Sequence, residues 1–263
     1  MATAIFRAFT NDGFLIAADG RMQALDGTII SETKQKIFSF GGNGSLAYSF
    51  TGRVGLGPVD GPDVMFDFIG QFKQTAQVIS TRRSPTLVKY AHRLTQHLQR
   101  VLKERCSDGR IKFSDEPSRI PGEVGSTIAE AMIDGYYSGL PSCVRVRFYR
   151  LNGQLVEPEI TSQELKAGGV WLHGFEMVGR LLCDKDPRFF NETSLRRLDT
   201  PLPHFSPGMH NAVIQARAYI EGCSSPEGLA LNSKIASSIG GRIHMASVTK
   251  KDGFKWVPGF EPG

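Results

Sequence analysis

The chain has 263 residues, enough for one large domain or two small ones, and its 40% apolar and 22% charged residues are ordinary for a soluble globular protein. A chain of this length can bury a full core without the support of metals or disulfides. The formal net charge of +5 comes from Lys and Arg spread along the whole sequence, whereas nucleic-acid-binding proteins more often have a basic stripe interleaved with aromatic residues. The charge therefore favours a solvated, mildly basic surface, and the remote alternative of a nucleic-acid-binding module depends on net charge alone.

The cysteines predict a reducing environment. Cys106, Cys143, Cys183 and Cys223 form no Cys-x-x-Cys pair, and the six histidines are scattered along the chain. This pattern favours reduced thiols, no metal site and a cytoplasmic location. The first residues contain no apolar signal-peptide core, and no window approaches the roughly 18 apolar residues of a membrane helix, so no membrane association is expected.

The first fifty residues are predicted to be β-strands. Side chains alternate along the first strand, Asp12-Gly13 indicates a hairpin turn, and an apolar run forms the second strand. A polar loop is expected over 19–33, and the Gly-rich turn at 41–44 joins two further strands. Two successive hairpins indicate an antiparallel sheet. The predicted strands cover residues 5–9, 14–18, 36–40 and 46–50.

Two helices are predicted next. Apolar residues recur at helical spacing over 64–72, just after Pro62. Ser84-Pro85 is a typical helix start, with serine as the N-cap and proline at the first helical position, and one apolar stripe follows over 87–102. Both helices are expected to pack a broad apolar face against a sheet.

The remainder of the chain returns to strands, then helices, then strands. Together with the first half, this order predicts a layered α+β fold in a single domain covering residues 1–263. The charged, proline-containing segment near 183–206 is expected to be a surface insertion. The predicted strands cover 127–133, 144–150, 169–172, 243–249 and 254–257, and the predicted helices cover 175–182 and 207–219.

Short motifs between residues 3 and 55 suggest a chemistry. Thr3 precedes a strand and a glycine turn, after which an apolar run ends in Ala-Ala-Asp19-Gly-Arg21. The segment Ser31-Glu-Thr-Lys-Gln-Lys36-Ile follows, and Gly52 comes directly after the fourth strand. In this order and spacing, the motifs resemble a proteasome β subunit of the N-terminal-nucleophile (Ntn) hydrolase superfamily, in a divergent, bacterial-type branch. Beyond residue 55 the resemblance is only topological.

The resemblance implies a four-layer α-β-β-α sandwich of two antiparallel sheets and a threonine-type peptidase or amidohydrolase. Thr3 would be the nucleophile, with its own α-amine as the base. Lys36 would stabilise the developing alkoxide, Asp19 would hold Lys36 charged and in place, and Gly52 would donate its N–H to the oxyanion. The resemblance further implies a peptide or small amide substrate, no cofactor, and self-association, usually as a ring.

Three departures from the family pattern support an alternative function. Removal of the initiator methionine would leave Ala2 before Thr3, whose nitrogen would then be an amide and not a base. The family's Asp and Ser before its Gly-Gly pair are Ala236 and Ile239 here, with Ser237 or Ser238 as possible substitutes. A Gly-Ser-Gly-Ser turn is replaced by 172–175, with His173 as a possible substitute donor. The alternative is a catalytically silent, proteasome-like subunit that acts as a structural or binding component of a ring.

Overall fold

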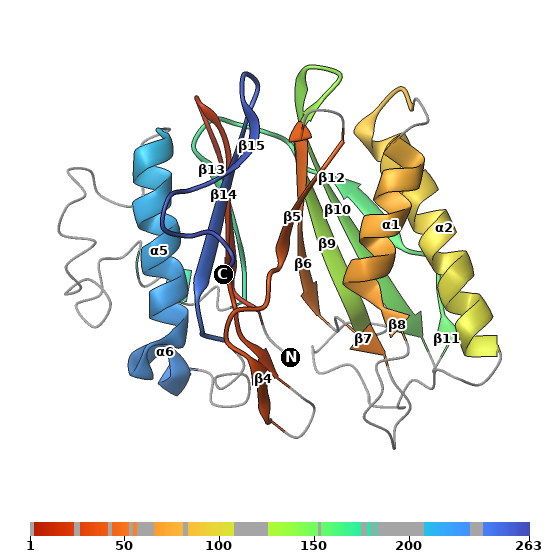
Figure 1. The fold of residues 1–263 in the computed structure, drawn as a ribbon, viewed down its shortest axis with the longest axis horizontal. Coiled ribbons are helices and arrows are strands. Elements are labelled where there is room, and N and C mark those ends of the chain that lie inside the picture. Colours follow the sequence, from red (N-terminus) through yellow and green to blue (C-terminus); the bar gives the residue numbers. More distant parts are fainter. Residues whose placement is uncertain are drawn as a thin grey trace. The chain divides into compact units, whose positions relative to one another are not determined.

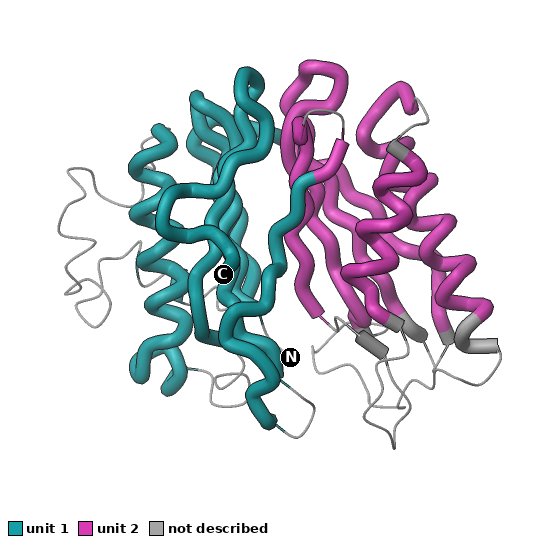
Figure 2. Tube along the Cα trace, in the orientation of Figure 1, with its two compact units in different colours: residues 1–39, 165–263 teal, residues 40–164 magenta. Residues whose placement is uncertain are grey.

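The structure is a computed structural model, and the residues it describes form two compact units (Figure 2). One unit comprises residues 1–39 and 165–263, and the other comprises residues 40–164. Each unit is built on one main β-sheet. The single domain predicted from the sequence stays a prediction. The described residues are 3–23, 27–41, 44–52, 55–56, 66–80, 84–107, 126–151, 154–174, 178–179, 182, 208–231 and 239–263.

The first unit contains a five-stranded antiparallel sheet in the order β13-β1-β2-β14-β15 (Figure 1). The predicted hairpin at Asp12-Gly13 is confirmed, because Thr10 Oγ1 accepts hydrogen bonds from both backbone amides of this turn at 3.2 Å. Gly13 has φ +140°, and a Cβ at this position would lie 2.4 Å from Val248 O. Only glycine fits there. The strands are β1 (Ile5–Thr10), β2 (Gly13–Asp19), β13 (Gly169–His173), β14 (Ile243–Thr249) and β15 (Gly253–Trp256).

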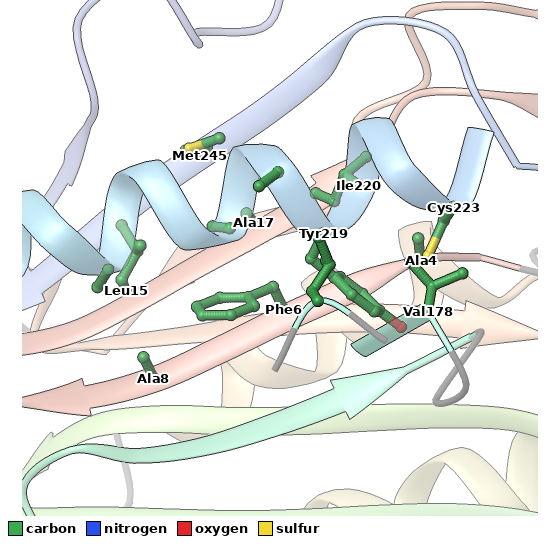
Figure 3. Packing of buried hydrophobic residues seen from close by; sticks show 14 of the residues in the cluster. Ala4, Phe6, Ala8, Leu15, Ala17, Val178, Tyr219, Ile220, Cys223 and Met245 are labelled. Atoms are coloured by element: carbon green, nitrogen blue, oxygen red, sulfur yellow. The ribbon is translucent and has the colours of Figure 1, made fainter. Parts of the chain in front are cut away.

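Helix α5 (Met209–Ser224) covers one face of this sheet and contacts β1 and β2. Alternate residues of the strands belong to one apolar cluster with the helix, as the period of two in a β-strand requires, and Figure 3 shows Phe6 beside Tyr219. Asp12 Oδ2 accepts a hydrogen bond from the Met209 amide at 3.0 Å, so the first hairpin also caps the helix. The labelled members of this apolar cluster are Ala4, Phe6, Ala8, Leu15, Ala17, Val178, Tyr219, Ile220, Cys223 and Met245.

The second unit contains most of a six-stranded sheet in the order β11-β10-β9-β6-β5, with β12 also paired to β10, and the boundary between the two units falls within β5, after Ser39. Helices α1 (Phe68–Ser80) and α2 (Leu87–Ser107) lie along one face of it (Figure 1). Aromatic rings join helix and sheet, with centroids 4.4 Å apart for Tyr48 and Phe72 and 5.7 Å apart for Phe68 and Phe148. The strands are β5 (Ile37–Phe40), β6 (Leu46–Gly52), β9 (Ser126–Tyr137), β10 (Leu140–Leu151), β11 (Gln154–Leu155) and β12 (Glu159–Ser162).

The predicted helix starts in the second unit are corrected by the structure. Thr86, and not Ser84, caps α2, because Thr86 Oγ1 accepts a hydrogen bond from the Lys89 amide at 3.2 Å. The Ser84 hydroxyl instead accepts a hydrogen bond from Arg93 at 3.1 Å. Helix α1 begins at Phe68, because Phe66–Asp67 form a short strand, β8, paired with β7 (Gly55–Leu56). The earlier part of the predicted helix over 64–72 lies largely outside the described residues.

The loop predicted over 19–33 contains a short hairpin of β3 (Met22–Gln23) and β4 (Ile29–Ser31). Strands of two or three residues are too short to produce a recognisable alternation. A six-residue helix, α6 (Pro226–Leu231), was not predicted either. The predicted insertion near 183–206 and most of the predicted helix over 175–182 lie outside the described residues, although Val178 and Leu182 are buried in the α5 cluster. Among the described helices, none has the length and apolar character needed to cross a membrane.

Candidate active site

The site is organised around Asp19, the last residue of β2 in the first unit. Its side chain is fully buried, at 0% exposure. The Asp19 amide donates to Ala4 O at 3.1 Å, and the Ala4 amide donates to Asp19 Oδ1 at 2.9 Å. The pairing of β1 with β2 therefore places this carboxylate beside the residue that follows Thr3.

Lys36, directly before β5, extends its ammonium group to the same place. Its Nζ lies 2.9 Å from Asp19 Oδ1 and 3.3 Å from Thr3 Oγ1. Thr3 and Lys36 are only 4% and 3% exposed, so a threonine hydroxyl, an ammonium and a carboxylate meet away from bulk water. The structure thus brings together Thr3, Asp19 and Lys36, the trio that the sequence singled out.

Each oxygen of the Asp19 carboxylate accepts two hydrogen bonds. Oδ1 accepts from the Ala4 amide and the Lys36 ammonium, each at 2.9 Å. Oδ2 accepts from the amides of Gly240 at 3.2 Å and Arg21 at 3.3 Å. A buried carboxylate is costly unless its oxygens are satisfied in this way. The four donors also fix the orientation of the carboxylate, and hence of Lys36.

Burial is the main influence on the titration of both charged groups. It lowers the pKa of Lys36 and raises the pKa of Asp19, since desolvation penalises the charged form of each. The attraction and hydrogen bond between the two groups act in the opposite direction on both pKa values, and the positive charge of Arg21 contributes to the lowering at Lys36. An ammonium in this setting can donate to the hydroxyl and stabilise an alkoxide formed on Thr3.

The sequence did not identify the contacts that support Asp19 from the far end of the chain. The Gly240 amide comes from a residue 221 positions away, and the Arg21 amide also donates to Gly240 O at 2.8 Å. The only available signals were the Arg in the Asp-Gly-Arg motif and the Gly240-Gly241 pair, and neither specifies a partner. Ile239, in the family's serine position, contributes its carbonyl, which accepts from Arg21 Nη1 at 3.3 Å.

His244, on β14, is a further buried titratable group of the first unit. It is 0% exposed, and neither ring nitrogen has a hydrogen-bond partner within the part of the chain that the structure describes. Burial lowers the pKa of His244 to about 4, and the charges of Arg242 and Lys36 act in the same direction. At neutral pH the imidazole is therefore uncharged.

Two other predicted site positions have different outcomes. Gly52 ends β6 with φ +94°, and a Cβ there would lie 2.7 Å from Ile128 O, so this position requires glycine. Because Gly52 belongs to the second unit, its role as an oxyanion donor stays a prediction. In the first unit, Gly174 has φ +113°, and a Cβ there would lie 2.9 Å from Thr3 O. His173 pairs with Ile5, and its carbonyl accepts from the Tyr219 hydroxyl at 3.0 Å; its role as a substitute donor stays a prediction.

No group of three or more His, Cys, Asp or Glu side chains that could hold a metal ion occurs among the residues described. The chemistry that the site can perform with its own groups is nucleophilic. It combines a hydroxyl, a buried cation in hydrogen-bond reach of that hydroxyl, and a carboxylate that orients the cation.

Comparisons with known proteins give a likeness at the level of the fold. No protein-family model matches the chain, and no curated protein matches it either. Among solved structures, Anbu (ancestral beta-subunit) from Yersinia bercovieri is 12% identical with a TM-score of 0.53, and the match covers 98% of this chain and 88% of that one. An Anbu Gly-1 mutant from Hyphomicrobium sp. strain MC1 is 12% identical with a TM-score of 0.52, covering 98% of this chain and 89% of that one. A further Anbu structure from the same strain is 11% identical with the same score.

The chain therefore has the mixed α+β fold of these Anbu structures over nearly its whole length. This confirms the resemblance predicted from the motifs at residues 3–55 as far as the fold is concerned. At identities this low, the likeness carries no information on activity, nucleophile or assembly.

Proposed function

We propose that the protein is a proteasome-like threonine amidohydrolase or peptidase that cleaves an amide bond with Thr3 as its nucleophile. The observation that carries this proposal is the position of Lys36 Nζ, 3.3 Å from Thr3 Oγ1 and 2.9 Å from Asp19 Oδ1, with all three side chains buried. A lysine held between a carboxylate and a hydroxyl is arranged to stabilise negative charge on that hydroxyl.

In the proposed reaction, the free α-amine of Thr3 takes the proton from Oγ1 as that oxygen attacks the substrate carbonyl carbon. The amide C–N bond then breaks, the protonated α-amine returns the proton to the leaving amine, and the acyl group stays on Oγ1 as an ester. Water, deprotonated by the same amine, hydrolyses this ester and releases the acid. Lys36 stays protonated throughout, and Asp19 keeps it in place.

Several parts of this proposal come from the resemblance and its fold. They are the four-layer α-β-β-α arrangement, the donation of the Gly52 amide to the oxyanion, self-association of the chain, and a cytoplasmic location. The substrate class, a peptide or small amide, also comes from the resemblance. Each of these statements stays a prediction.

The alternative function is a catalytically silent subunit with a structural or binding role. The observation that favours it is the sequence around Thr3, because the nitrogen of this residue is a peptide amide as long as Ala2 is attached. Ala236 and Ile239 also stand where the family has a carboxylate and a hydroxyl. A site with the trio but without a free amine has no internal base.

The experiment is the intact mass of the untagged protein, followed by incubation with a β-lactone and a peptide boronate. The hydrolase is supported if the chain begins at Thr3 and gains one lactone adduct that the Thr3→Ala variant lacks. The control variant Thr249→Ala, at the end of β14, should retain the adduct. A chain that begins at Thr3 and gains no adduct contradicts the hydrolase and favours the silent subunit. If Ala2 is retained, the same labelling is carried out after a protease-removable tag has been placed directly before Thr3.

A further inference from the structure

The side chain of Arg21 joins three segments that surround Asp19. Its Nε and Nη2 each lie 3.1 Å from a carboxylate oxygen of Glu32, which follows β4. Its Nη1 donates to the carbonyl of Ile239 at 3.3 Å. This planar, two-pronged contact is specific to arginine, because lysine cannot present two parallel donors.

The turn at Gly240-Gly241 is shaped around this ion pair. Gly240 has φ +149°, and a Cβ there would lie 2.7 Å from the Arg21 guanidinium carbon. Gly241 has φ +75°, and a Cβ there would lie 2.4 Å from Glu32 O and 2.6 Å from Glu32 Oε2. The backbone of both glycines therefore lies against the Arg21–Glu32 pair, where only glycine fits.

Backbone hydrogen bonds connect the same segments. The Arg21 amide donates to Gly240 O at 2.8 Å, and the Arg242 amide donates to Glu32 O at 2.7 Å. The Gly240 amide is thereby directed at Asp19 Oδ2, 3.2 Å away. The ion pair, the glycine turn and the carboxylate form one connected unit.

We propose that the Arg21–Glu32 ion pair is a positioning element of the site, which presents the Gly240 amide to Asp19 Oδ2 and so keeps Oδ1 directed at Lys36 and Ala4. Arg21 and Glu32 act through Asp19 and do not reach the reacting hydroxyl. The inference deepens the proposed function, on which it rests for the statement that Asp19 and Lys36 are catalytic. It also explains how the site is supported although Ala236 and Ile239 lack the side-chain groups of the family.

Because the Arg21–Glu32 pair is partly exposed, its positioning role can be tested separately from a contribution to global stability. The side chains of Arg21 and Glu32 are 23% and 44% exposed, so their attraction is screened by water and contributes little to global stability. The effect of breaking the pair is therefore expected at Gly240 and Lys36, with a much smaller change in the midpoint of urea unfolding.

The test measures two local properties of the full chain by NMR: the exchange rate of the Gly240 amide with solvent and the pKa of Lys36 from its Cε shift. The variants are Arg21→Lys, Arg21→Gln and Glu32→Gln. The matched control is Arg217→Gln, which breaks the exposed Arg217–Glu221 pair of α5. Loss of the hydrogen bond at Gly240 is expected to speed its exchange about tenfold in the three variants and not in the control.

The pKa of Lys36 then shows whether a variant acts through the lost charge of Arg21 or through the lost geometry of its ion pair. Arg21→Gln is expected to raise the pKa of Lys36, because the charge of Arg21 contributes to its lowering. Arg21→Lys retains a positive charge and is expected to speed Gly240 exchange with a smaller pKa change. The inference is overturned if the Gly240 amide of Arg21→Lys and of Glu32→Gln exchanges with solvent within about twofold of the wild-type rate. These two variants decide the test even if Arg21→Gln does not fold. Neither measurement requires hydrolysis. If the wild type is inactive but the variants show faster Gly240 exchange and a changed Lys36 pKa, only the proposed function is contradicted. If the wild type is active but the variants show neither change, only this inference is contradicted.

Discussion

Each unit of the molecule contains an ion pair with little exposure to solvent, and the hydrogen bonds of the two pairs lead to different groups. In the first unit, the side chains of Lys36 and Asp19 are 4% and 0% exposed, and Lys36 Nζ donates a hydrogen bond to Thr3 Oγ1. In the second unit, Arg147 and Glu130 are 21% and 7% exposed, with Arg147 Nε 2.7 Å from Glu130 Oε2. The first pair ends on a buried hydroxyl, whereas the second leads outward to water.

The outward path of the second pair follows the strand register. Thr51, Glu130, Arg147 and Glu159 face one another in turn on β6, β9, β10 and β12. Glu159 is 43% exposed, and the hydrogen bond from the Tyr149 hydroxyl holds the pKa of its carboxyl below the usual range. A row of alternating charge across neighbouring strands stabilises a sheet. The Lys36–Asp19 pair, which is buried and within hydrogen-bond distance of a hydroxyl, is therefore the pair on which the proposed function rests.

The largest expected effect is that of Lys36→Met, which leaves the Asp19 charge in a fully buried position without its partner. We expect the free energy of unfolding to fall by about 3–5 kcal/mol, measured by urea denaturation at pH 7. The double variant Asp19→Asn with Lys36→Met removes both charges and is expected to recover a large part of this loss. A loss for Lys36→Met no greater than that for an exposed pair would show that burial does not distinguish the Lys36–Asp19 pair from exposed pairs.

The next effect concerns the pH dependence that His244 gives the first unit. Its pKa is lowered to about 4 in the folded state, so the unfolded chain binds more protons between that value and the ordinary value of about 6.5. The contribution of the uncharged His244 to the free energy of unfolding is therefore fully present above about pH 6.5. It is lost progressively as the pH falls toward 4, by up to about 3 kcal/mol.

His244→Gln removes this titration. We expect its urea midpoint to depend less on pH between 6.5 and 4 than that of the wild type, with His97→Gln, on the exposed side of α2, as the control. Parallel pH profiles for the wild type and His244→Gln would show that His244 is not the group responsible.

A smaller effect is expected for the second unit. Glu130→Gln keeps the shape of the side chain but removes the charge opposite Arg147, which retains contacts with Tyr149 at 2.6 Å and Glu159 at 3.8 Å. We expect a loss of about 1–2 kcal/mol in the free energy of unfolding, because a charged hydrogen bond is weakened and no charge is left isolated. A loss equal to that of Lys36→Met would show that exposure does not distinguish the two pairs.

The smallest effect is expected at the Arg217–Glu221 pair of α5, whose side chains are 52% and 34% exposed. Arg217→Gln should change the free energy of unfolding by less than about 0.5 kcal/mol, since water and salt screen such a pair. The free energy of unfolding of this variant, measured at low and high salt, provides the baseline for the other variants. A loss above about 1 kcal/mol would show that the effect of breaking an ion pair does not decrease with its exposure.

Much of the fold and the centre of the site could be predicted because the signals are local. Alternation and turn residues located the strands around Asp12-Gly13, since side-chain direction and turn geometry depend on neighbouring residues. The trio of Thr3, Asp19 and Lys36 was identified from motifs within the first 55 residues, and the structure brings its members within hydrogen-bond distance. The start of α2 was missed by two residues because Ser84 and Thr86 are both good caps, and only the surrounding contacts choose between them.

The sequence by itself singled out Thr3, Asp19 and Lys36 and located the strands next to them. Only the tertiary structure decided how the trio is supported: that Arg21 pairs with Glu32, that the amide of Gly240 reaches Asp19 across 221 positions, and that His244 is buried without a partner among the described residues. The physical reason is that the pattern of a strand specifies a face, whereas a hydrogen bond also requires the register of neighbouring strands and the path of a turn. Those depend on the packing of the whole sheet.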